Sequence, residues 1–455
     1  MQMRNKEKGK LTIIISGMLL VSMISMWACS GEKMEAGVLS QQETTEYGNT
    51  TLSFFYSGEN TGWIGAMEEL CEDFMKKYPS ITINMEYSSS QSYTEELKAK
   101  EATDEFPDVF EIENPYMFES AGKLGVINQE IGNLVEKPII IDNKIYALPF
   151  YSTSYGIVYN QILFKKYNLE IPKTYEEFLH VCGELKYQGI APLAIGGSEE
   201  SSELGWMSYF FLTEVQEEGD DWQIRRRKKE VSFQDQDMKK ALQDFQNLMT
   251  GEYILEDSLN MSDNQIISQM INQKVAMYYG TPAMLTKIWE AYPKATDSGK
   301  TPLGEEIEND TSTMRLGWFY LPDEKGKSVV IDKIGSILSV SRECMEDREK
   351  KEAAETFLKF CFEKDNYRKI LQAMYGMPTT KDAVLYAAPA VQQGVLTDYR
   401  YAERSENFLG NMETPESFQA DMKEILDNLA ADIIGVDDAA KKLDEGWDDS
   451  ERIEQ

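Results

Sequence analysis

The stretch from Lys144 to Gly197 constrains the fold of this chain more than any other part. It begins with the alternating run Ile145–Phe150, passes through a polar break at residues 152–154, and resumes with a second apolar run that ends at Asn160. Alternation of apolar and polar residues predicts β-strand. The order of strand, break, strand and following helix is typical of α/β proteins.

The helix of this stretch has recognisable start and stop signals. Thr174 and Glu177 have the spacing of a capping box, in which the Glu177 side chain reaches back to the amide at the start of the helix. Gly189 supplies the residue after the last turn. The pattern predicts that one apolar face is buried, formed by Phe178, Leu179, Cys182 and Leu185.

The ordered strings "IYALP", "YGIVYN" and "TYEEF" within this stretch resemble the central signature of extracellular solute-binding proteins of ABC importers, the sugar-binding family 1 type. The resemblance covers most of 51–447 and is strongest at 144–197, 270–280 and 335–378. It implies a periplasmic-binding-protein-like α/β fold of type II, with two α/β lobes joined by a hinge around a central cleft. One departure is Thr281-Pro282 after Gly280, where sugar binders usually have Trp.

The sequence predicts four parts along the chain. Residues 1–28 form a lipoprotein signal peptide and 29–50 a flexible tether of polar composition. The resemblance implies a first lobe from 51–150 plus 320–365 and a second lobe from 151–319 plus 366–455. About 400 residues after the tether are enough for two well-buried lobes.

The N-terminus predicts export. Four basic side chains precede an uncharged run from Leu11 to Ala28, and the small Ala28 directly precedes Cys29. That pattern predicts lipidation of Cys29, although Met26 and Trp27 depart from the usual signal. The alternative is that the run stays as a membrane anchor. Both alternatives put the rest of the chain on the extracytoplasmic face of the cell membrane.

The formal net charge is −32, and the basic N-terminal segment makes the remainder more negative still. Such a charge argues against nucleic acid and against electrostatic adhesion to anionic lipid. It favours solubility of an exposed protein, with a cationic solute such as a polyamine as the alternative. The basic run Arg225–Lys229 is expected to be a solvated loop.

The sequence has no G-x-S-x-G motif, no G-x-G-x-x-G motif and no complete Walker motif. His180 is the single histidine of the chain. Because an H-E-x-x-H zinc site needs two histidines, such a site is excluded, and a Ser-His-Asp mechanism is improbable. His180 is expected on an exposed helix flank. No catalytic residue, cofactor or metal site is predicted. Carboxylates are abundant, so a secreted glycoside hydrolase remains an alternative. Cys71, Cys182, Cys344 and Cys361 are expected to be buried thiols, although a disulfide is permitted.

The chain from Thr51 to Phe110 alternates strands and helices, which predicts parallel strands with right-handed crossovers. Ligands of such sheets bind at the carboxyl ends of strands, so position alone makes these residues candidates: Glu59, Asn60, Trp63, Asp108, Glu111 and Asn114. For Asp108, this assumes that the "PDV" at 107–109 ends the third strand.

The resemblance implies a fuller set of ligand-binding residues. The first-lobe wall is Glu59, Asn60, Trp63, Asp108, Asn114 and Tyr116; the hinge contributes Tyr151 and Thr153; the second lobe contributes Trp206, Tyr209 and Phe408. Carboxylate and amide groups suit sugar hydroxyls, and aromatic faces suit their C–H groups. The sequence leaves open whether the aromatic members pack in the core instead.

These features predict a lipid-anchored, monomeric substrate-binding component of an ABC importer. It would capture a small solute, most simply a mono- or oligosaccharide, and deliver it to a separate membrane permease. A surface sensor on the same fold is a further alternative.

Overall fold

The computed structural model describes residues 49–454 except 59–60, 89–92, 104, 197–201, 217–220, 293–313, 383, 403, 408 and 410–413. The predicted signal peptide, Cys29 and nearly all of the tether lie outside the described residues, as do Glu59, Asn60 and Phe408.

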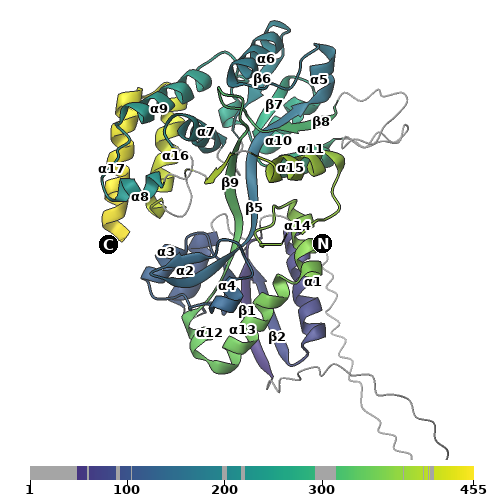
Figure 1. The fold of residues 1–455 in the computed structure, drawn as a ribbon, viewed down its shortest axis with the longest axis vertical. Coiled ribbons are helices and arrows are strands. Elements are labelled where there is room, and N and C mark those ends of the chain that lie inside the picture. The colour runs from purple at the N-terminus through teal and green to yellow at the C-terminus, as the bar shows by residue number, and fades with distance from the viewer. Residues whose placement is uncertain are drawn as a thin grey trace, which may run out of the picture. The chain divides into compact units, whose positions relative to one another are not determined.

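The described elements alternate between strands and helices along much of the chain (Figure 1). The strands are β1 (Thr50–Tyr56), β2 (Ile81–Tyr87), β3 (Val109–Glu111), β4 (Ile139–Ile141), β5 (Lys144–Asn160), β6 (Ala191–Ala194), β7 (Val275–Gly280), β8 (Leu316–Phe319), β9 (Val329–Val340) and β10 (Arg404–Asn407). The helices up to the middle of the chain are α1 (Thr61–Lys77), α2 (Tyr93–Ala102), α3 (Pro115–Ser120), α4 (Gln129–Gly132), α5 (Gln161–Lys166), α6 (Tyr175–Tyr187), α7 (Ser202–Glu214), α8 (Trp222–Arg227) and α9 (Gln236–Met249). The later helices are α10 (Asp263–Ile271), α11 (Ala283–Ala291), α12 (Arg342–Glu346), α13 (Arg348–Cys361), α14 (Lys364–Met374), α15 (Ala390–Arg400), α16 (Glu416–Ala430) and α17 (Val436–Glu454), and a 3-10 turn covers Ser258–Asn260.

The strands pair in the order β2-β1-β3-β9-β5-β7-β6. β1 is parallel to both β2 and β3, which confirms the parallel strands predicted for this part of the chain. β9 is antiparallel to β3 and to β5. Chain segments far apart in the sequence therefore share one hydrogen-bonded ladder.

β5 is one continuous strand of 17 residues, so the predicted break at 152–154 is wrong. Ser152, Thr153 and Ser154 pair with Ile334, Lys333 and Asp332 of β9. Their polar side chains do not stop the strand, because the backbone hydrogen bonds to β9 continue on both sides of them.

The predicted caps of α6 are confirmed. The amide of Glu177 donates a 3.1 Å hydrogen bond to Thr174 Oγ1, and Gly189 has a φ of +75° just after the helix. The Glu177 carboxylate accepts from the amide of Lys173 at 2.7 Å, one residue earlier than expected. His180 is exposed, as predicted.

The buried apolar residues that the structure describes form four clusters, which we group into two cores joined by β5 and β9. The first core contains residues from Leu52 to Tyr151 and from Ile337 to Tyr386. The second core contains residues from Tyr155 to Ile331, Met377, Val395 and residues from Leu409 to Trp447. Figure 1 shows β5 and β9 running side by side from the elements around β1 to those around β7.

The limits of the two cores differ from the lobe limits expected at 320 and 365. Val329 and Ile331 at the start of β9 pack in the second core. Tyr367 and Ile370 of α14 pack in the first core, against α1 and β5. The difference arises because β9 itself passes from one core to the other, which a division by resemblance did not anticipate.

The basic run near 225 is partly a structural element and not a solvated loop. Arg226 lies in α8, is only 4% exposed, and forms ion pairs with Asp444 and Asp448 of α17. Buried charges require such partners. Arg227 and Lys229 are exposed.

Two chemical features of the described residues bear on function. No helix among them has the length and apolar character needed to cross a membrane. Cys71, Cys182, Cys344 and Cys361 are free and buried, and burial raises the pKa of the Cys344 thiol to about 12.

Candidate functional site

A carboxylate and two serines meet at the carboxyl ends of β1 and β3, beside β9. Glu111 is the last residue of β3 and is 6% exposed. Its Oε2 accepts a 2.5 Å hydrogen bond from the amide of Ser57, and its Oε1 accepts one of 2.5 Å from Ser336 Oγ. The charge of Glu111 is thus held at the edge where ligands of parallel sheets bind.

Tyr93 of α2 contacts the ends of β1 and β3. Its hydroxyl donates to the carbonyl of Glu111 at 2.7 Å, and its ring stacks on Phe55 with centroids 5.0 Å apart. Burial, followed by the charge of Glu111, raises the pKa of the Tyr93 hydroxyl well above its ordinary value. Tyr93 is therefore a neutral hydrogen-bond donor that fixes the end of β3.

Asp108 lies at the other end of β3, so the assumption that it follows the third strand is wrong. It immediately precedes Val109, the first residue of β3. Its carboxylate accepts hydrogen bonds from the amide and hydroxyl of Ser53 and pairs with Lys350 Nζ at 2.8 Å. These contacts give Asp108 a structural role between β1 and α13.

Asn114 and Tyr116 begin α3, just beyond the end of β3. Asn114 is 7% exposed, and its side chain caps the helix by accepting from the amide of Met117 at 3.3 Å. Tyr116 is half-buried, with the guanidinium carbon of Arg227 5.8 Å from its ring centroid. Tyr116 therefore keeps an accessible edge near the end of β3, whereas Asn114 is used mainly within the fold.

Trp63 and Tyr151 lie against each other where α1 meets β5. Their ring centroids are 5.5 Å apart at an angle of 60°, and both are buried. Thr153, two residues further along β5, is half-buried and pairs with Lys333. Of these three residues, Thr153 is the one that is not buried.

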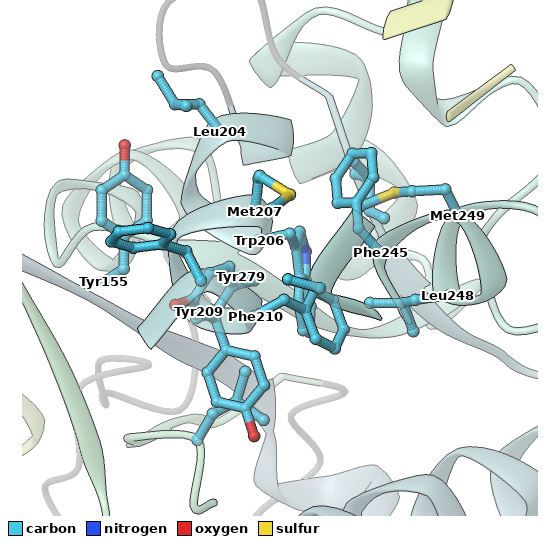
Figure 2. Close-up of a cluster of buried hydrophobic side chains, with 14 of the residues drawn as sticks. Tyr155, Leu204, Trp206, Met207, Tyr209, Phe210, Phe245, Leu248, Met249 and Tyr279 are labelled. Carbon is cyan, nitrogen blue, oxygen red and sulfur yellow. The ribbon is translucent and has the colours of Figure 1, made fainter. Parts of the chain in front are cut away.

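Trp206 and Tyr209 of α7 lie inside the second core. Figure 2 shows Trp206 enclosed by Tyr279, Phe210 and Met207. Trp206 is 0% exposed, and its ring centroid is 4.4 Å from that of Tyr279. The Tyr209 hydroxyl donates to the carbonyl of Pro322 at 2.7 Å. Neither aromatic ring offers an open face, because α7 turns this side towards the sheet.

The structure thus brings together one subset of the predicted residues. The residues near the ends of β1 and β3 and the middle of β5 are Trp63, Tyr116, Tyr151 and Thr153. Trp206 and Tyr209, by contrast, lie in the second core. Its position at a strand end makes Glu111 a candidate from the sequence, but the set implied by the resemblance does not include it. Ser57 and Ser336 were missed, because small hydroxyl residues give no pattern by which to select them.

The groups at this edge are suited to recognition of a polar molecule. Carboxylate and hydroxyl groups can accept and donate hydrogen bonds, and neighbouring rings can cover apolar faces. Within the residues that the structure describes, no group of three or more His, Cys, Asp and Glu side chains could hold a metal ion.

Comparison with known proteins gives consistent results. Residues 58–368 match the sequence model of a family described as bacterial extracellular solute-binding protein. A multiple sugar-binding protein of Streptococcus mutans is 27% identical over 149 residues, which is 31% of this chain and 34% of that protein. An uncharacterized ABC transporter extracellular-binding protein of Pyrococcus horikoshii is 25% identical over 251 residues, which is 51% of this chain and 57% of that protein. The alignments therefore span between a third and somewhat over half of these relatives.

A solved structure described as a chitin oligosaccharide binding protein has the same fold. Its TM-score is 0.72 at 17% identity, with 88% of this chain and 98% of that chain covered. This likeness confirms the expected periplasmic-binding-protein-like α/β fold.

Proposed function

Because the chain belongs to the family of bacterial extracellular solute-binding proteins, we propose that it captures a mono- or oligosaccharide and presents it to an ABC permease. The two cores would act as two lobes that close on the solute by bending where β5 and β9 pass between them. Closure of two domains on a ligand is an established mode of hinge motion. The permease and its ATPase would be separate chains.

The observation that carries this proposal is the polar group at the carboxyl ends of β1 and β3. The Glu111 carboxylate of β3 bonds both to Ser336 of β9 and to the amide of Ser57, which directly follows β1. β9 pairs with β5, and both of these strands pass between the two cores. A carboxylate fixed by two donors is a preorganised acceptor for sugar hydroxyls. The similarity to a multiple sugar-binding protein supports a carbohydrate as the solute.

We propose that the ligand-contacting residues are Glu59, Asn60, Glu111, Tyr116 and Thr153, with Asn114 and Phe408 as neighbours. Trp63 and Tyr151 would back this surface. We assign Asp108 to the framework because it lies at the amino end of β3, away from this edge, and pairs there with Lys350. Trp206 and Tyr209 also belong to the framework, because they are enclosed in the second core.

We further propose that binding is reversible and that no bond in the solute is broken. The two best-buried carboxylates of the first core that were candidates, Asp108 and Glu111, are fixed at opposite ends of β3 by structural partners. This arrangement supports recognition over the alternative of paired-acid glycoside hydrolysis, which uses two carboxylates facing one bond.

Calorimetry with a panel of mono- and oligosaccharides and of polyamines tests the solute class. Heat of binding with a sugar, and none with spermidine, is the expected result. Chromatography of the same mixtures after long incubation should return the sugar unchanged. Binding of polyamines alone would overturn the carbohydrate assignment, and sugar products would overturn the assignment as a binding protein.

Export and anchoring form a separate proposal. We propose that Cys29 is lipidated after removal of residues 1–28, so that the protein is held on the extracytoplasmic face of the membrane as a monomer. Mass spectrometry of the N-terminal peptide should find an acylated cysteine. A Cys29→Ser variant should be released into the medium or remain unprocessed; unchanged membrane retention with normal processing would contradict lipid anchoring.

A further inference from the structure

Three chain segments meet at Tyr151, between the two cores. β5 passes through this point, and β9 lies beside it. The third segment is the chain around Met377, which bonds to Ser152 in both directions: Ser152 N donates to Met377 O at 2.9 Å, and Met377 N donates to Ser152 O at 2.7 Å. Any relative motion of the cores has to be absorbed by these segments.

The ladder between β5 and β9 is irregular on both sides of Tyr151. Pro149 pairs with Ile337, Tyr151 pairs with Ser336, and Ser152 pairs with Ile334. Phe150 is thus an extra residue on β5, and Gly335 is an extra residue on β9. The second bulge cancels the first, so the same register holds in both cores. Each bulge leaves its extra residue outside the ladder and loosens the pairing there.

The Tyr151 ring is packed against two glycines. A Cβ atom on Gly335 would lie 2.0 Å from Tyr151 Cε2, and one on Gly376 would lie 2.8 Å from Tyr151 Cδ2. Contacts this short do not occur in folded proteins, so neither position accepts a side chain while the ring stays in place. Trp63 closes a further side, and Tyr151 is only 7% exposed.

We propose that Tyr151 is the pivot about which the two cores turn, and that its contacts with Gly335 and Gly376 set the range of the motion. The bulges concentrate bending at this residue because the regular ladder resumes on either side. The Tyr151 ring contacts Gly335 of β9 and Gly376, so it maintains the distance between these two segments and β5 as the strands twist. Tyr151 thereby acts mechanically and not as a ligand contact. The motion serves the proposed capture function, but its existence does not depend on the identity of the solute.

Spin labels on the two cores provide the test. Glu72 in α1 has a side chain that is 62% exposed, and Tyr187 at the end of α6 is 85% exposed. Both are changed to Cys in the full chain, with Cys29→Ser to prevent labelling there. The thiols of the four described cysteines are buried and stay unlabelled. Pulsed electron–electron double resonance then gives the distribution of distances between the two labels in the absence of ligand.

The expected result is that Gly335→Ala and Gly376→Ala each displace the mean distance, because the new methyl group pushes the ring. Gly65→Ala is the matched control, since a Cβ there meets no atom within 4 Å. Adding Tyr151→Ala to Gly335→Ala should return the mean towards that of the parent protein. Tyr151→Ala alone should broaden the distribution.

Two results would overturn the proposal. One is a folded Gly335→Ala variant whose distances match those of Gly65→Ala. The other is a Tyr151→Ala variant, whose smaller side chain creates no clash, with a distribution as narrow as that of the parent. Circular dichroism of every variant reports whether it is folded. No sugar is present, so failure to bind carbohydrate would count against the proposed function and leave this result unaffected.

Discussion

Arg226 Nε in α8 donates a hydrogen bond of 3.1 Å to Asp444 Oδ1 in α17, and the guanidinium group lies over the ring of Trp447. This pair joins two helices that are more than 200 residues apart in the sequence. Because the Arg226 side chain is 5% exposed, the pair is shielded from water, and removing one partner costs more than it does at a surface ion pair.

Asp444→Asn should destabilise the protein in a pH-dependent way. Burial acts to raise the pKa of Asp444, but hydrogen bonds from Ser232, Gln234 and the amide of Phe233, together with the charge of Arg226, outweigh it and lower the pKa. A carboxylate with a lowered folded pKa contributes stability that is present above its unfolded pKa, about 3.9, and is lost as the pH falls through the folded value.

The measurement is urea unfolding of both proteins from pH 7 down to pH 3. The variant should lose about 1–3 kcal/mol at neutral pH, because the hydrogen bonds from Arg226 and Ser232 lose a charged acceptor, while Arg226 keeps its ion pair with Asp448. The difference should shrink below about pH 4. A constant difference over the whole range would show that the Asp444 charge is not responsible.

Lys350→Ala should destabilise the first core without changing solute affinity. Lys350 Nζ is the charged partner of Asp108, and among the described residues Ser53 is the other donor to this carboxylate. The expected loss of unfolding free energy is about 1–3 kcal/mol. Lys364→Ala, at an exposed position at the start of α14, is the control and should change stability by less than about 0.5 kcal/mol. A loss of affinity in Lys350→Ala would return Asp108 to the ligand site.

Trp206→Ala should cost about 3–5 kcal/mol of unfolding free energy, because it empties the space next to Tyr279 and Phe210. The milder Trp206→Phe should remain folded and keep its affinity for sugar. Thermal unfolding and calorimetry on the same preparations separate the two roles. Weak binding by a stable Trp206→Phe protein would identify the indole as a ligand contact.

Glu111→Gln should weaken sugar binding about tenfold or more, since a hydrogen bond to a charged group contributes about 1.5–3 kcal/mol. The amide nitrogen of Gln also cannot accept from Ser57 or Ser336, so the strand ends lose a partner. Glu256→Gln, at an exposed position between the β-bridge at Ile254 and the 3-10 turn at Ser258–Asn260, serves as the control. Titration calorimetry is the readout, and equal affinities in the two variants would remove Glu111 from the site.

The sequence was sufficient where local signals decide the structure. The caps at Thr174 and Gly189 depend on residues close together in the chain, and the structure confirms them. The parallel strands expected between Thr51 and Phe110 are confirmed as well. The resemblance added the type of fold, because an ordered string of residues carries topology that periodicity does not.

The sequence failed where the outcome depends on distant partners. Nothing near Arg226 indicates that Asp444 will pair with it, and nothing near Asp108 indicates Lys350. The indole of Trp206 could stack on a sugar or pack in a core, and its residue type is the same in either case. Only the packing of α7 in the second core shows that Trp206 is a core residue. Ser152 and its neighbours looked like a break because the ladder with β9 is not visible in the local sequence.

The first core has a consequence for the order of events during synthesis. Its strands come from the beginning of the chain, but it also requires β9, α13, α14 and Tyr386. A ribosome must therefore translate most of the message before this half can assemble. Until then the nascent polypeptide lacks the contacts that stabilise the folded first core. A polypeptide that is still unfolded can pass through a narrow secretion channel.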